Sequence, residues 1–126
     1  MGPVESMIRA TTTNGMRLKT VPGRAVFKVG SIERDKIVLL FGLKETRTPL
    51  SWRLLESIPT FLAGKEWTQI ASQFDVEGVP GGLDQFCRSE ITRAVGGYVA
   101  GLLEHAGLVD VDLSRPARVR LKSTSQ

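Results

Sequence analysis

The sequence predicts an α+β protein in which a small N-terminal β-sheet precedes a mainly helical part that ends in a β-hairpin. Three observations lead to this prediction. Residues 24–41 contain two short apolar stretches, which are typical of strands. Residues 83–106 carry apolar side chains at helical spacing. After Gly107 the apolar spacing falls to two residues, as in a β-hairpin.

Charge is distributed unevenly along the 126 residues, whose net charge is +4. Residues 1–54 have a balance of +6, residues 55–112 have −6, and residues 113–126 have +4. A polyanion is attracted to the two basic ends and repelled by the acidic middle. The alternative is a solvated surface of uneven charge without a specific partner.

The composition excludes several classes of protein. Cys87 is the only cysteine, so an intrachain disulfide or a zinc site built on paired cysteines cannot form. No apolar run approaches the roughly 18 residues of a membrane span, and we expect no membrane partner. Residues 1–15 lack the apolar core of a signal peptide. We expect a cytoplasmic protein whose first 15 residues are flexible.

Residues 16–50 predict a small β subdomain. The stretch RAVFKVGSI (residues 24–32) places Phe27 and Val29 on one face of a strand, and DKIVLLF (residues 35–41) reads as a buried strand. An isolated hairpin is only marginally stable. We therefore expect a third strand from MRLKT or TRTPL, or packing against the second part of the chain.

Residues 51–122 predict a helical unit, followed by a short tail at residues 123–126. Ser51 is a plausible N-cap for a helix that begins at the next residue. Pro59 is expected to break this helix. EWTQI (residues 66–70) alternates like a short strand.

The helical pattern from Leu83 onward allows two readings. One is a pair of helices at residues 84–90 and 92–106, the second capped by Thr92 and ended by Gly107. The other is a single helix over residues 84–106, because the apolar stripe does not reset. We favour two helices, since Gly96 and Gly97 would weaken the single one by roughly 1 kcal/mol each.

The final hairpin has a predicted register. A loop of residues 115–117 keeps the apolar side chains of both strands on one face. In this register Arg115 and Arg118 stay without acidic partners near the tip and are the expected phosphate contacts. The expected cross-strand pairs are Asp112 with Arg120, Asp110 with Lys122, and Val111 with Leu121.

The stretch TRAVGGYVAGLLEHAGLVDVDLSRPARVRL (Thr92–Leu121) resembles the recognition helix and wing of winged helix-turn-helix proteins. Within it, LLEHAGLV is similar to a segment common among bacterial regulators of the MarR and related types. The resemblance implies a helix, a short strand, two helices and a two-stranded wing over residues 51–122. It also implies binding of double-stranded DNA, as a transcriptional regulator or as the DNA-recognition part of a larger system.

The resemblance assigns nucleic-acid contacts to the second helix and the wing. On that helix only Arg93 could make a bidentate base contact, so phosphate contacts by the wing tip and the basic N-terminal hairpin are favoured over base reading. The alternative is a protein-interaction module, a homodimer or a complex with another protein, that uses the smooth face from Gly97 to Gly101. The candidate nucleic-acid contacts are Thr92, Arg93, Gly96, Gly97, Arg115, Arg118, Arg120 and Lys122.

Catalytic chemistry has little support in the sequence. His105 is the only histidine, and its place near a predicted helix end favours a capping role. There is no phosphate-binding loop and no Gly-x-Ser-x-Gly motif. We expect no enzyme activity, no cofactor and no metal. Trp67 is expected in the core, with a base-stacking role as the minority reading.

Overall fold

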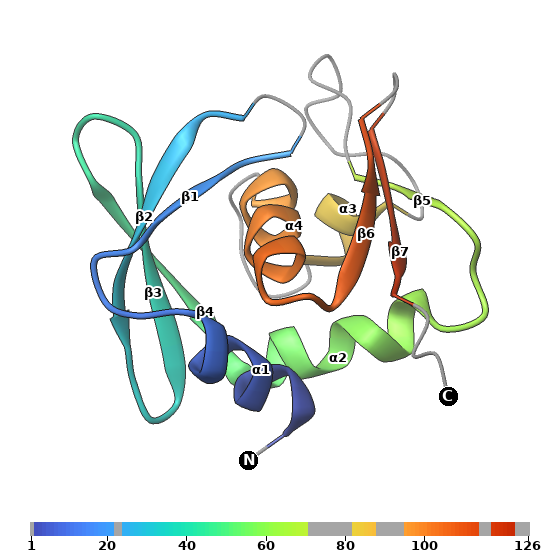
Figure 1. The fold of residues 1–126 in the computed structure, drawn as a ribbon, viewed down its shortest axis with the longest axis horizontal. Coiled ribbons are helices and arrows are strands. Elements are labelled where there is room, and N and C mark those ends of the chain that lie inside the picture. Colours follow the sequence, from blue (N-terminus) through green and yellow to red (C-terminus); the bar gives the residue numbers. More distant parts are fainter. Residues whose placement is uncertain (1, 22–23, 71–81, 88–94, 114–116, 123–126) are drawn as a thin grey trace.

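The computed structural model of the chain describes residues 2–21, 24–70, 82–87, 95–113 and 117–122. It contains two antiparallel sheets, and helix α4 lies between them (Figure 1). The predicted α+β class is confirmed. The helices are α1 (Pro3–Thr11), α2 (Trp52–Leu62), α3 (Leu83–Cys87) and α4 (Gly96–His105).

The larger sheet is formed by the predicted N-terminal strands. Both segments considered for a third strand take part, so the sheet has four strands in the order β1-β2-β3-β4. Phe27 and Val29 point into the core, as their alternation predicts. The strands are β1 (Arg17–Lys19), β2 (Val26–Ile32), β3 (Lys36–Phe41) and β4 (Thr46–Ser51).

The smaller sheet brings the predicted short strand together with the final hairpin. Its strands are arranged in the order β5-β7-β6, and each neighbouring pair is antiparallel. Along the chain, α2 precedes β5, α3 and α4 follow it, and β6 and β7 come last. The strands are β5 (Thr68–Gln69), β6 (Val109–Asp112) and β7 (Arg118–Leu121).

The register of the β6–β7 hairpin differs from the prediction by two residues. The shift is even, so the same side chains still face the core. Side-chain alternation cannot distinguish registers that differ by two residues, and the predicted three-residue loop was too short. The observed pairs are Asp112 with Arg118, Val111 with Val119, Asp110 with Arg120, and Val109 with Leu121.

The prediction of a flexible N-terminus is wrong for residues 3–11, which form α1. Val4 and Ile8, one helical turn apart, are fully buried. The α1 N-terminus is capped by α2, because the Glu56 carboxylate accepts hydrogen bonds from Val4 N (3.2 Å) and Glu5 N (2.8 Å). An acidic group at this end also compensates the helix dipole.

Helix α2 begins where the sequence predicts and continues past the expected break. The Ser51 hydroxyl accepts a hydrogen bond from Leu54 N at 3.1 Å, which confirms the N-cap. Pro59 lies inside the helix instead of ending it. Buried residues on both sides of the proline, Ile58 and Leu62, hold the last turn against the core and offset the hydrogen bond that proline cannot donate.

Helices α3 and α4 lie where the sequence predicts a pair of helices at residues 84–90 and 92–106, although the described part of each is shorter than predicted. Residues 88–94 between them, which include the predicted N-cap Thr92, lie outside the described residues. The C-terminal end of α4 agrees with the sequence, because Gly107 has a φ of 80° and donates to Glu104 O (3.1 Å). Glycine adopts this left-handed conformation without strain.

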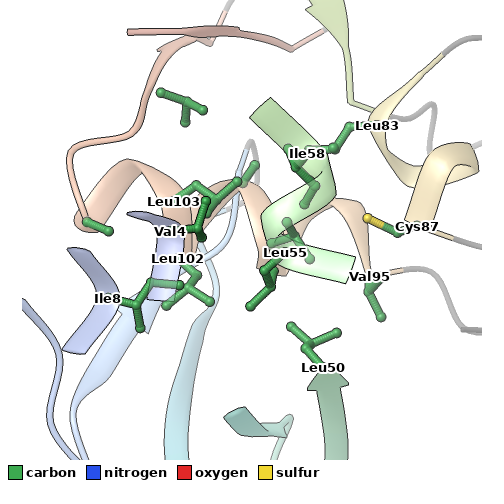
Figure 2. Close-up of a cluster of buried hydrophobic side chains, with 14 of the residues drawn as sticks. Val4, Ile8, Leu50, Leu55, Ile58, Leu83, Cys87, Val95, Leu102 and Leu103 are labelled. Carbon is green, nitrogen blue, oxygen red and sulfur yellow. The ribbon is translucent and has the colours of Figure 1, made fainter. Parts of the chain in front are cut away.

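One hydrophobic core connects the sheets and helices. Figure 2 shows side chains of four helices and of β4 that meet in one cluster. The N-terminal residues predicted as a separate β subdomain share this core with the helical unit. Helix α4 packs against β1 of the larger sheet and against β6 of the smaller sheet. The labelled residues of the cluster are Val4, Ile8, Leu50, Leu55, Ile58, Leu83, Cys87, Val95, Leu102 and Leu103.

Candidate nucleic-acid interface

The small-residue face of α4, predicted to meet DNA or a partner protein, lies against strand β1 and the residues after it. Gly97 O accepts a hydrogen bond from Val21 N at 3.1 Å. A Cβ atom at Gly97 would lie 2.8 Å from Val21 O, and one at Gly101 would overlap Lys19 O. The glycines therefore let the chain's own backbone approach the helix.

Gly96 and Gly97, which the sequence predicts as nucleic-acid contacts, therefore do not lie on an exposed face of α4. Gly96 is buried, and Gly97 is half-buried against Val21. Helical spacing identifies a smooth face but not what covers it. The expectation that this face is exposed, for base reading or for a protein partner, is wrong. Thr92 and Arg93, which precede it, lie outside the described residues.

The arginines of the β6–β7 hairpin are paired with aspartates. Arg118 Nη2 lies 2.5 Å from Asp112 Oδ2, and Arg120 Nε lies 3.4 Å from Asp110 Oδ2. The prediction that Arg118 lacks an acidic partner is therefore wrong, because the register shift moves it opposite Asp112. Lys122, predicted opposite Asp110, is instead beyond the end of β7 and exposed.

Two further residues concern the β6–β7 hairpin. Trp67, expected in the core, is half-buried beside the arginines of β7. The guanidinium carbons of Arg120 and Arg118 lie 4.5 Å and 5.8 Å from its ring centroid. The Trp67 ring therefore makes cation–π contacts with arginines of its own chain. Arg115, the other predicted tip contact, is outside the described residues.

The larger sheet has a cationic outer face that the sequence analysis did not assign residue by residue. Alternation along the strands puts Phe27, Leu39 and Leu50 on the core face. No described element covers the opposite face (Figure 1). The strands themselves contain no Asp or Glu. Their cations all fall on this outer face: Arg17, Lys19, Lys28, Lys36 and Arg47.

Three of these cations form a row across the sheet. Arg17 is opposite Lys28, Lys28 is opposite Leu40, and Leu40 is opposite Arg47. Strands are about 4.8 Å apart, so the two ends of the row are about 14 Å apart. We call the five cations on this side the cationic sheet face.

The carboxylates that pair with the cationic sheet face lie in the turns between its strands. Lys28 Nζ lies 2.9 Å from Glu45, Lys36 Nζ lies 3.6 Å from both Glu33 and Asp35, and Arg47 Nη2 lies 4.0 Å from Glu33. A hydrogen bond from the Ser31 hydroxyl, supported by Lys36, holds the pKa of Glu33 below its ordinary value. Among the described residues, the structure gives Arg17 and Lys19 no acidic partner.

The described residues place narrow limits on other chemistry. They contain no group of three or more His, Cys, Asp and Glu side chains that could hold a metal ion. The strands that form the cationic sheet face have one aromatic residue on each of two strands, Phe27 and Phe41, and both point toward the core side. This face can therefore form ion pairs with an anion, but it offers no aromatic ring for base stacking.

Charge balance was the sequence signal that pointed to this surface, because residues 1–54 carry +6. Selecting the individual residues additionally requires the pairing of all four strands. Comparison with protein-family models, curated proteins and solved structures finds no match to the chain. In the described part of the chain, no helix has both the length and the apolar character needed to cross a membrane.

Proposed function

We propose that this chain binds double-stranded DNA mainly through phosphate contacts made by the cationic sheet face. One observation carries the proposal: the four strands contain five Lys and Arg residues and no Asp or Glu, and all five cations lie on the side of the sheet that no described element covers (Figure 1). Lysine and arginine side chains that neutralise phosphates supply most of the affinity in non-specific DNA binding.

The geometry favours a duplex over a single strand. The row from Arg17 to Arg47 extends about 14 Å, comparable with the roughly 12 Å width of the major groove. Long side chains at its ends could therefore reach phosphates on either side of a groove. Single-strand binding depends on exposed aromatic rings, which this face does not present.

The proposal includes a winged-helix arrangement for the C-terminal unit, but with a changed role for its helix. The order α2, β5, α3, α4, β6, β7 and the sheet order β5-β7-β6 agree with the arrangement that the resemblance implies. The glycine face of α4 is covered by β1, so base reading by this face is not part of the proposal. We therefore expect weak sequence preference.

Fluorescence anisotropy with a labelled duplex of arbitrary sequence tests the proposal. Binding should weaken steeply as salt rises, and the double variant Arg17→Ala/Arg47→Ala should reduce the slope of log K against log salt by about 1.8, or about 0.9 for each lost phosphate contact. An unlabelled duplex of different sequence should compete about equally well.

The matched control is Arg118→Ala/Arg120→Ala, which removes the same charge from the smaller sheet. Both of these arginines lie closer to an aspartate (2.5 Å and 3.4 Å) than Arg47 lies to Glu33 (4.0 Å). The control variant should change the slope much less. The proposal fails if no duplex binding occurs at low salt, or if the control variant loses more binding than the variant of the cationic sheet face.

A further inference from the structure

A hollow of about 360 Å³ opens between β1 and the C-terminal half of α4. It lies at the edge of the larger sheet and shares two lining residues, Arg17 and Lys19, with the cationic sheet face. Four of the residues that line it are basic and one is acidic. Its lining consists of Arg17, Leu18, Lys19, Arg24, Gly101, Glu104 and His105.

Arg24 is held in place from the backbone outward. It adopts a φ of 56°, in the left-handed region that residues with a side chain seldom occupy. Its N–H donates to Thr20 O at 3.0 Å, and the Thr20 hydroxyl accepts from Ala25 N at 3.0 Å. This turn directs the guanidinium toward α4.

The Arg24 guanidinium meets Glu104 through two hydrogen bonds, from Nη1 to Oε1 (2.8 Å) and from Nη2 to Oε2 (3.3 Å). This contact raises the pKa of Arg24, so the guanidinium stays charged. A guanidinium has five N–H donors, and the carboxylate uses only part of them. Among the described residues, the remaining donors of Arg24 have no hydrogen-bond partner.

The charge in the hollow exceeds what Glu104 neutralises. Arg17, Lys19 and Arg24 carry three positive charges at its lining and Glu104 one negative charge, so these four residues sum to +2. His105 Nε2 lies 2.9 Å from Thr11 O. A carbonyl oxygen only accepts, so Nε2 donates this bond and fixes the imidazole at the rim.

We propose that this hollow binds a phosphomonoester dianion. Two uncompensated positive charges match the near −2 charge of a phosphomonoester better than the single charge of a phosphodiester in a DNA backbone. The Nε–H of Arg24 and the second hydrogen of the neighbouring Nη, which Glu104 does not use, form a planar pair of donors that phosphate oxygens accept. This site does not depend on the proposed function, since it needs neither a duplex nor the rest of the cationic sheet face.

The shared chemistry has two sources, free phosphate or a mononucleotide, and the 5′-phosphate at the end of a DNA strand. Titration with inorganic phosphate, at ionic strength kept constant with sodium chloride, tests the site itself. Backbone amide NMR signals of residues 17–19, 24 and 101–105 should shift in a saturable way. Chloride alone should not produce these shifts. Shifts that fail to saturate would overturn the proposal.

Two variants outside the cationic sheet face make this test specific. Arg24→Gln should weaken phosphate binding about fivefold or more, whereas Glu104→Gln should tighten it about threefold or more, because each changes the charge of the hollow by one unit in opposite directions. Damage to the fold would weaken binding in both variants, so changes in the same direction would overturn the proposal.

A second arm distinguishes the sources and separates this proposal from the DNA-binding proposal. Two duplexes of one sequence are compared, one with 5′-phosphates and one with 5′-hydroxyl ends. Tighter binding of the phosphorylated duplex, reversed by inorganic phosphate, identifies the strand end. Equal binding of both duplexes, with saturable phosphate binding, identifies the free anion. Phosphate binding without duplex binding would contradict only the DNA-binding proposal, and duplex binding without phosphate binding only this one.

Discussion

Gly101 sets how closely strand β1 approaches helix α4. Its Cα faces Lys19 O across the contact, and no side chain larger than hydrogen fits between them. Gly97, one turn earlier, has the same relation to Val21 O. The close approach brings Tyr98 against Phe27, with their ring centroids 5.3 Å apart. The spacing that resembled a surface for a partner is therefore an internal packing contact.

Replacing Gly101 with alanine should destabilise the protein by about 2–3 kcal/mol, because the added methyl group overlaps a backbone oxygen that cannot move independently of its sheet. Gly97→Ala, with a Cβ distance of 2.8 Å to Val21 O, should cost less. Urea unfolding measures both.

The sign of this effect makes the result decisive. In a helix with open space around it, Gly→Ala raises stability by up to about 1 kcal/mol. Unchanged or increased stability of the Gly101 variant would show that β1 does not pack on α4 as described.

At the scale of elements, helix α1 depends on a side chain from elsewhere in the chain. Nine residues form too short a helix to be stable alone in water. Its N-cap residue, Gly2, has no side chain to accept a hydrogen bond, and Glu56 of α2 takes that role. The apolar face of α1 then packs on the core through Val4 and Ile8.

Replacing Glu56 with alanine should lower the free energy of unfolding by about 1–2 kcal/mol, as expected for loss of a helix cap. Glu56→Gln keeps one acceptor oxygen and should cost less. Glu66→Ala, at an exposed position after α2, is the matched control and should stay within about 0.5 kcal/mol of the wild type. Equal effects of Glu56→Ala and Glu66→Ala in chemical denaturation would exclude the capping role.

At the scale of the whole molecule, helix α4 joins the two sheets into one folding unit. The N-terminal helix and the larger sheet share a core with α2, α3 and α4 (Figure 2). Neither part buries its apolar side chains without the other. The basic N-terminal sheet is therefore fixed relative to the rest of the molecule, which a rigid phosphate-binding surface requires.

A chain that begins at residue 16 should lose cooperative folding, because it lacks α1 and exposes the core that Val4 and Ile8 cover. Tryptophan fluorescence and far-UV circular dichroism should report one coincident transition for the full chain. They should report a broad change without a clear midpoint for the shortened one. A shortened chain that unfolds at the same denaturant concentration would show that α1 is dispensable.

Local signals in the sequence determined the α+β class, strands β2 and β3, the Ser51 cap and the end of α4 at Gly107. These features depend on side-chain period and on hydrogen bonds between near neighbours. The core face of the final hairpin was also predicted correctly, because side-chain alternation alone decides it.

Only the tertiary structure decided what covers α4, which register the hairpin adopts, and where the exposed cations gather. Each of these depends on which distant segments meet. Hairpin registers two residues apart bury the same side chains, and a row of glycines accepts a helix, a strand or a partner equally well. The candidate site moved from α4 to the sheet because packing covers the glycine face. It moved from Arg118 because this side chain lies 2.5 Å from Asp112, whereas Arg17 and Lys19 of the sheet have no acidic partner among the described residues.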